Sequence, residues 1–291
     1  MRVTEALPRR IEDEELSGLD RLELPIAAAP SIARRAWAAA WPQLAAVALL
    51  LGLWQLVVIM ELYPPWVLPG PGAVIPRVFE DLGGNLPAAI ATTLRRAGAG
   101  YLFALVIGMA IGLAIVRWRL LRTAVASLIT GLQTMPSIAW FPLAILLFGL
   151  SEAAIMFVIV LGAAPSIANG LINGVDHIPR ILLRAGEVLG ARGVDRYRFV
   201  VFPAALPAFI GGMKQAWAFA WRSLMAGELL VIIAQQPSLG VQLQLQRDLS
   251  DAEGLLATMV VILLIGIVVD LAVFGSIDRR IRTRRGLVES S

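Results

Sequence analysis

Six apolar runs, each about 20 residues long or longer, dominate this sequence and limit what it can fold into. An α-helix of about 20 apolar residues, rising 1.5 Å per residue, crosses a hydrocarbon layer roughly 30 Å thick. The chain is also 58% hydrophobic and only 16% charged, a composition typical of membrane proteins. We therefore predict an all-α polytopic membrane protein with six transmembrane helices, at about residues 43–62, 97–116, 124–150, 152–172, 206–233 and 254–277.

The placement of the arginines predicts the orientation of these helices. One set of flanks carries most of them, including Arg34, Arg117 and the cluster between residues 180 and 198. The opposite flanks carry only Arg77, Arg95, Arg96 and Arg247. Because Lys and Arg collect on the cytoplasmic side of a membrane, we expect a multi-pass protein of a bacterial plasma (inner) membrane with both termini in the cytoplasm.

The polar segments divide the chain into four parts. The first is acidic, contains arginines and lacks the apolar core of a signal peptide, so we expect a flexible cytoplasmic tail. The second holds the first transmembrane helix and an extended, Pro- and Gly-rich extracytoplasmic crossing at 63–76. The third is the transmembrane core, with a cytoplasmic loop at about 176–206, and the fourth is a basic cytoplasmic C-terminus. The four parts are residues 1–34, 35–84, 85–280 and 281–291.

Two outer segments of the core are expected to be helical. Residues 85–96 read as an amphipathic stretch leading into the second transmembrane helix. Residues 236–253 are expected to form a polar helix that lies along the outer surface or dips back from it.

Several kinds of chemistry are excluded by the residues that the chain lacks. It has no cysteine and a single histidine, His177, so Cys/His zinc sites and thiol nucleophiles are ruled out. The only lysine, Lys214, does not lie in a phosphate-binding loop, so the chain is not an ATPase. The basic residues sit at the ends of apolar runs, which argues against a nucleic-acid partner.

The cytoplasmic loop contains a glycine-rich polar stretch, RAGEVLGARGVDRYRFVVFP, from Arg184 to Pro203. Gly190 and Gly193 are expected to end a helix and turn the chain, and Pro203 is expected to start the next helix. Small residues let another protein approach the backbone closely, and the arginines give a positive rim suited to an acidic partner. We predict a docking surface made of Arg184, Ala185, Gly186, Gly190, Ala191, Arg192, Gly193 and Pro203.

The spacing of this stretch resembles the cytoplasmic loop of ABC importer permeases, the inner-membrane components of binding-protein-dependent transport systems. That loop has Glu-Ala-Ala, three residues, Gly, nine residues, Ile, one residue and Leu-Pro. The corresponding positions here are Arg184-Ala185-Gly186, Gly190, Val200 and Phe202-Pro203. Arg184 replaces an acidic residue, which suggests a partner surface with compensating acids.

Two further segments, 133–142 and 217–230, are similar to the nitrate, sulfonate and taurine branch of that family, and the resemblance extends over about residues 85–280. It implies a type I ABC importer permease fold. It also implies a permease subunit, not itself an enzyme, that forms the pathway for a small solute. The expected cargo is a small anion such as nitrate, sulfonate or taurine, although the same branch also carries neutral pyrimidine-like compounds.

The resemblance further implies the partners. The chain would bind no cofactor, because ATP and Mg would sit on separate ATPase subunits. An extracytoplasmic solute-binding protein, a second copy of the chain in a homodimer and the lipid membrane complete the expected set. A secondary transporter or channel that needs no ATPase remains the alternative.

Some polar residues and prolines fall inside the apolar runs. A charge there costs about 2.5–3.5 kcal/mol, so Arg222, Glu228 and Asp270 each need a partner or a wet pathway. Arg95 or Arg96 is the expected partner of Glu228, and Asp270 is expected to have a structural partner. Two prolines in the third run favour either a kinked or a broken helix. The candidate pathway residues are Thr134, Pro136, Ser137, Pro142, Arg222 and Glu228.

Overall fold

The computed structural model describes residues 32–284, so most of the predicted acidic tail and the end of the basic C-terminus lie outside the described residues. The chain divides into two units, residues 1–60 and 61–291. The described part of the first unit is a single long helix, α2 (Ile32–Ile59), which contains Pro42. Its apolar stretch agrees with the first predicted transmembrane helix.

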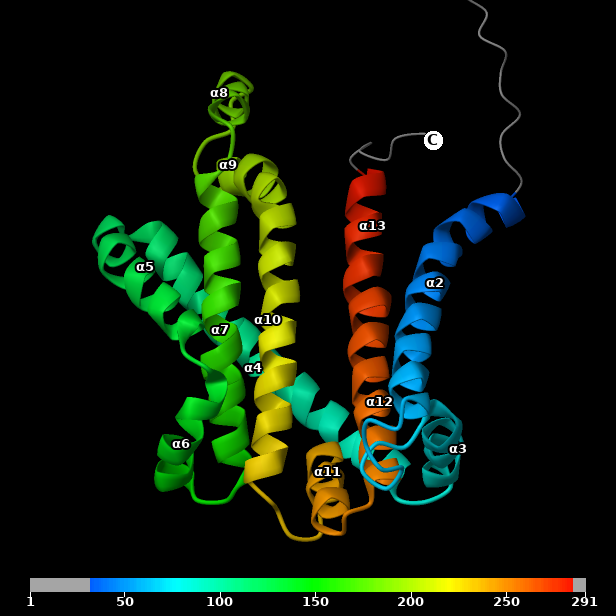
Figure 1. The fold of residues 1–291 in the computed structure, drawn as a ribbon. Coiled ribbons are helices and arrows are strands. Elements are labelled where there is room, and N and C mark those ends of the chain that lie inside the picture. The colour runs from blue at the N-terminus through cyan, green and yellow to red at the C-terminus, as the bar shows by residue number, and fades with distance from the viewer. Residues whose placement is uncertain (1–31, 285–291) are drawn as a thin grey trace, which may run out of the picture. The chain divides into compact units, whose positions relative to one another are not determined.

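All regular secondary structure in the described residues of the second unit, 61–284, is helical (Figure 1). In chain order the helices are α3 (Pro71–Leu82), α4 (Leu86–Arg117), α5 (Arg119–Thr134), η1 (Ser137–Trp140), α6 (Phe141–Phe148), α7 (Glu152–Asp176), α8 (Arg180–Val188), α9 (Val194–Arg196), η2 (Tyr197–Val201), α10 (Phe202–Leu230), α11 (Leu239–Asp248), α12 (Ala252–Val269), η3 (Asp270–Phe274) and α13 (Gly275–Arg284). Of the short elements, η1 is a 3-10 turn, whereas η2 and η3 are π-helical.

Five of the six predicted transmembrane helices are confirmed, and the third along the chain differs from the prediction. Five helical stretches within the described residues are long and apolar enough to cross a membrane: Ala40–Ile59, Leu86–Arg117, Glu152–Asp176, Val194–Leu230 and Ala252–Ile281. The third predicted span is divided instead into Ser127–Thr134 and Ser137–Phe148, which meet at 98°. It counts as the sixth span only if this bent pair crosses the membrane as one unit.

The outer segments differ in part from the sequence predictions. The crossing predicted to be extended over 63–76 becomes helical at Pro71, where α3 starts, because proline fits the first turn of a helix. The stretch predicted to lead into the second transmembrane helix, 85–96, is confirmed as helical from Leu86 and is continuous with that helix in α4. The polar helix predicted within 236–253 is confirmed as α11.

Arg77 ties α3 to the segment that precedes α12. Its guanidinium lies 3.0 Å from a carboxylate oxygen of Asp81 and 3.0 Å from one of Asp251. Burial lowers the pKa of Arg77, but the hydrogen bond with Asp81 and the charge of Asp251 outweigh it, so the pKa lies above its ordinary value.

The second unit packs around α7, which contacts both α4 and α10 extensively. Small residues allow these contacts to be close. A Cβ added to Gly108 would lie 2.6 Å from the Ala164 carbonyl oxygen, and one added to Gly170 would lie 2.7 Å from the Cα of Gly212. Lipid supplies little hydrophobic drive for helix association, so close van der Waals packing of this kind holds membrane helices together.

A buried charge cluster closes one end of this packing. Arg96 of α4 and Glu228 of α10 form an ion pair of 3.0 Å, with side chains 2% and 0% exposed. Arg96 also lies 2.7 Å from Glu152, at the start of α7, and donates to the side-chain oxygen of Gln236 at 2.9 Å. Of the two arginines proposed as partners of Glu228, Arg96 is therefore the one that pairs with it.

The segment after α10 is bound to the same cluster. Thr93 donates to Glu228 at 2.9 Å and accepts a hydrogen bond from the backbone amide of Leu239 at 3.0 Å. The Gly240 amide donates to Glu228 at 3.1 Å. The cluster thus joins α4, α7, α10 and α11, and it satisfies both oxygens of a fully buried carboxylate.

Figure 1 shows how the second unit is arranged from end to end: α8 and the end of α13 lie at one end, and α3, α6 and α11 lie at the other. The loop at 176–206 and the polar helix α11 are therefore on opposite sides of the helices. This agrees with the alternation of inner and outer connections predicted from the arginines.

The close packing of α7 on α10 predicts the effect of filling it. Gly170→Leu should lower the unfolding free energy by about 1–3 kcal/mol, because the new side chain meets the backbone of α10, which cannot rotate away. Gly98→Leu is the matched control, since nothing lies within 4 Å of a Cβ at that position. Thermal unfolding of the purified variants in detergent measures both. Equal midpoints for the two variants would contradict this account.

The charge cluster predicts a larger loss. Arg96→Leu leaves Glu228 buried without its cation, which should cost about 3–5 kcal/mol. Adding Glu228→Gln should recover part of the loss because a neutral amide is cheaper to bury. Arg247→Leu removes an exposed pair with Asp248 and should cost less than about 1 kcal/mol. Thermal unfolding of the three variants tests this order, and equal losses for Arg96→Leu and Arg247→Leu would refute it.

Candidate functional site

The break in the third predicted span follows from two prolines. Pro136 has no backbone N–H to donate and forces Met135, before it, into an extended conformation with ψ 126°. The chain re-enters a helix through η1, and Pro142 lies in the first turn of α6, where its missing N–H costs nothing. Of the two interpretations left open by the sequence, a kink and a break, the structure has the break.

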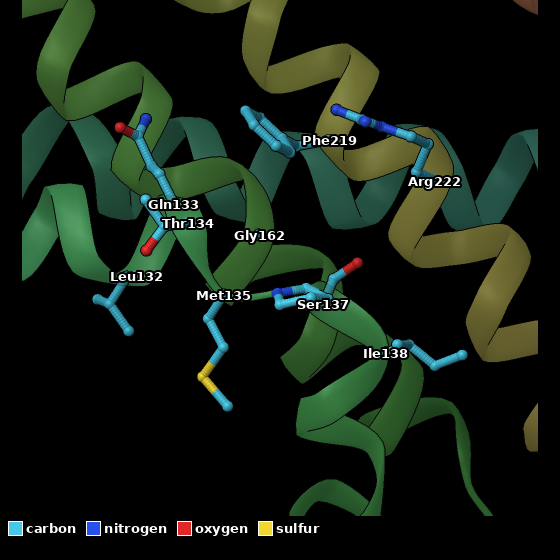
Figure 2. Close-up of a pocket in the computed structure, with 10 residues that line it drawn as sticks. Leu132, Gln133, Thr134, Met135, Ser137, Ile138, Gly162, Phe219 and Arg222 are labelled. Atoms are coloured by element: carbon cyan, nitrogen blue, oxygen red, sulfur yellow. The ribbon is translucent and has the colours of Figure 1, made fainter.

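A cavity of about 310 Å3 lies between this break and α10. In Figure 2, Phe219 and Arg222 of α10 lie across the cavity from Thr134 and Ser137. Four of the six candidate pathway residues, Thr134, Pro136, Ser137 and Arg222, therefore line one cavity although they come from separate transmembrane segments. The other lining residues include Gln133, Met135 and Gly162, and none of the lining residues is acidic.

Arg222 is the only charged residue in the lining of this cavity. Its Nε donates to the Ala218 carbonyl oxygen at 3.2 Å, and its guanidinium carbon lies 4.7 Å from the centre of the Phe219 ring. Among residues 32–284, no carboxylate forms an ion pair with it. Structural pairing, one of the two roles considered for Arg222, is therefore not observed in the described part of the chain.

Beside the cavity lies a hydrogen-bonded network of amide side chains that was not predicted from the sequence. Gln133 donates to the Ser166 hydroxyl at 2.9 Å, and Asn169 donates to the Gln133 side-chain oxygen at 2.7 Å. The network fixes the end of α5 against α7. The sequence contained a signal for this network, because glutamine and asparagine side chains within apolar runs need hydrogen-bond partners when they are buried.

Two candidate pathway residues do not line the cavity. Glu228 is fully buried in the Arg96 cluster, so the structure places it in the structural role considered for it. Pro142 acts as a helix-starting residue of α6. Asp270 has the structural partner expected for it, an ion pair of 3.0 Å with Lys214.

The loop at 176–206, which the family resemblance predicts to couple to an ATPase and which is called the coupling loop below, contains the short helix α8 (Figure 1). Gly190 ends this helix with φ +85°, the Gly190 amide donates to the Glu187 carbonyl at 3.1 Å, and the Ala191 amide donates to the Gly186 carbonyl at 2.9 Å. This is a Schellman motif, which satisfies carbonyls at a helix end. Gly193 turns the chain again with φ +54° before α9. The predicted capping roles of both glycines are confirmed.

One residue of the predicted docking surface faces inward. A Cβ added to Gly186 would lie 2.6 Å from the Val200 side chain, so Gly186 is small because it packs against its own chain. The prediction that it faces a partner is wrong. The outer surface is formed by exposed apolar side chains, Ile181, Val188, Leu189 and Val194, beside Arg184 and Arg192.

The remaining residues of the predicted docking surface are exposed or partly exposed. Ala185 is exposed on α8 and Ala191 is partly exposed after it. Pro203 lies in the first turn of α10, as predicted for a helix start. Arg196 pairs with Glu187 at 3.2 Å, which braces the loop. Residues 32–284 contain no group of three His, Asp or Glu side chains that could hold a metal ion.

Comparison with known proteins places this architecture in a family. The model of the binding-protein-dependent transport system inner membrane component matches residues 102–283. An ABC transporter permease protein of Methanocaldococcus jannaschii is 31% identical over 228 residues, which cover 77% of this chain and 84% of that protein. The taurine transport system permease protein TauC of Escherichia coli is 28% identical, covering 84% of this chain and 89% of its own length.

A nitrate import permease protein, NrtB of Leptolyngbya laminosa, is 30% identical over 65% of this chain and 70% of its own length. Among solved structures, a chain of the inward-facing MetNI methionine ABC transporter aligns with a TM-score of 0.57 and 20% identity, covering 67% of this chain and 95% of that one. This likeness supports the type I importer permease fold. The chain belongs to the family of binding-protein-dependent transport system inner membrane components, the membrane permease subunits of ABC transporters.

Proposed function

We propose that this chain forms the translocation pathway of an ATP-driven type I importer for a small anion of the nitrate, sulfonate or taurine kind. The observation that carries the proposal is the cavity at the broken span, where Arg222 is the only charge and has no carboxylate partner among the described residues. A cation without a carboxylate partner costs free energy inside a membrane helix, and binding of a passing anion lowers that cost.

The chemistry of the cavity supports an anion over a cation. Arg222 offers guanidinium donors, Thr134 and Ser137 add hydroxyl groups, and no acidic residue competes for them. The broken backbone at Met135 and Pro136 lies beside the cavity, as expected where irregular chain lines a pathway. The names of two relatives agree with an anionic group on the cargo, since one is a nitrate permease and the other a permease for taurine, which carries a sulfonate.

The motor is proposed to be a pair of separate ATPase subunits, which carry ATP and Mg and dock on the coupling loop. The exposed apolar residues of α8 suit insertion into a groove, and the neighbouring arginines suit acidic groove walls. Closure of the ATPases would then move the loop and the helices attached to it as rigid bodies. The complete assembly would contain a homodimer of this chain and an extracytoplasmic solute-binding protein.

The proposed orientation places the coupling loop, residues 1–34 and residues 281–291 in the cytoplasm. Residues 35–84 would then contain the first transmembrane helix and its outer crossing, and residues 85–280 the transmembrane core. The distribution of arginines in the sequence supports this arrangement.

Reconstitution separates this function from its alternative. Liposomes that contain the chain, its ATPase and its binding protein should accumulate the anion only with ATP. The chain alone, given an ion gradient, should transport nothing. Gradient-driven uptake by the chain alone would establish the alternative, a secondary transporter or channel.

Gly190→Glu tests the coupling loop. The substitution adds bulk and negative charge at an exposed turn, so it should abolish copurification of the ATPase while the membrane helices stay folded. Gly190→Ala is the matched control, because it carries the same backbone strain without the charge or the bulk. Undiminished ATPase binding by Gly190→Glu would exclude this docking site.

Arg222→Gln tests the pathway. The variant keeps a polar side chain but loses the charge-assisted hydrogen bond, worth about 1.5–3 kcal/mol, so anion uptake should fall about tenfold or more. Assembly with the ATPase should be unchanged because Arg222 has no ion-pair partner among the described residues to lose. Loss of folded protein, measured by size-exclusion chromatography, would favour a structural role instead.

A further inference from the structure

A second cavity, of about 530 Å3, opens on another side of α10, toward α12 and η3. It is larger than the cavity at the broken span. The residues that define its character are Lys214, Trp217, Trp221, Arg222, Gly266 and Asp270. Arg222 is a lining residue of both cavities.

The charges around this second cavity do not balance. Lys214 and Asp270 neutralise each other in an ion pair of 3.0 Å. Arg222 adds a positive charge that no carboxylate of the described chain compensates. A solute with one negative charge would make the cavity neutral, whereas a cation or a dianion would leave a net charge at the membrane interior.

The wall between the two cationic residues is aromatic and preorganised. The rings of Trp217 and Trp221 are stacked, with centroids 6.0 Å apart and planes at 24°. Tyr101 meets Trp217 edge-on at 5.5 Å and donates its hydroxyl to the Met213 carbonyl at 3.0 Å, which holds the first ring in place. Such a wall binds an apolar or aromatic body and offers nothing to a small inorganic ion.

We propose that this cavity is a second station of the translocation pathway and that it selects organic monoanions. The anionic group, a sulfonate or carboxylate, would lie at Arg222, and the apolar body would lie on Trp217 and Trp221. Because Arg222 borders both cavities, it could pass the anionic group from one to the other without releasing it. The inference rests on the proposed transport function and narrows its substrate class, since nitrate has no body for the tryptophans to contact.

Equilibrium dialysis with the full chain in lipid nanodiscs tests this selection without the binding protein. Benzenesulfonate and nitrate are the two probes. Benzenesulfonate should bind about tenfold or more tightly than nitrate, because its ring is buried against the tryptophans. Arg222→Gln should weaken both probes, since both use the guanidinium.

Gly266→Leu fills the second cavity from the α12 side. A Cβ at this position fits, because the nearest atom, Trp221 Nε1, lies 3.7 Å away. The variant should lose the preference for benzenesulfonate about tenfold and keep its affinity for nitrate. Gly98→Leu adds the same side chain on α4, where nothing lies within 4 Å, and should bind both probes as the parent does. Trp221→Leu, which removes the aromatic face without filling the cavity, should repeat the loss.

The outcomes separate the inference from the function on which it rests. Equal binding of the two probes, or an equal loss of both in Gly266→Leu, overturns the second station, and the same holds if lipid occupies the cavity and benzenesulfonate does not bind saturably. ATP-driven anion uptake by the reconstituted complex is unaffected by those results. Failure of that uptake with every anion tried, despite selective binding in nanodiscs, overturns the proposed function instead.

Discussion

The buried ion pair between Arg96 and Glu228 is the interaction on which the rest of the second unit depends. Both side chains are almost fully removed from solvent, so their charges are tolerable only because each has its partner and further hydrogen bonds. The cluster joins α4 to the start of α7, the end of α10 and the start of α11. It therefore sets where α10 lies, and α10 carries Arg222 to the cavity.

Two charged residues in the second half of α10 have different surroundings because of their spacing along the helix. Arg222 and Glu228 are six residues apart on α10, and six residues turn an α-helix by about 240°, so they face different neighbours. Glu228 faces α4 and its arginine, whereas Arg222 faces two cavities. One charge can thus hold the helix in place through an ion pair, while the other is available to bind a solute.

Much of the candidate site was predictable because prolines, glycines and charges in membrane helices act locally. Pro136 and Pro142 indicated an interruption, and Gly190 and Gly193 indicated the turns of the coupling loop. Gly186 was misread because a small residue can serve an outside partner or an inside neighbour, and only the position of Val200 decides between them. Gln133 was missed because its partners, Ser166 and Asn169, are about 35 residues away along the chain and become neighbours only on folding.

The sequence by itself determined the class of the molecule: the approximate limits of five of the six predicted apolar helices, and the family. These follow from length, composition and spacing, which depend on neighbours along the chain. The tertiary structure alone decided that Arg96 and not Arg95 pairs with Glu228, that the third span is broken at 98°, and that Arg222 borders two cavities. These depend on the rotation and crossing of packed helices, because the period of the helix alone does not say which face meets which neighbour.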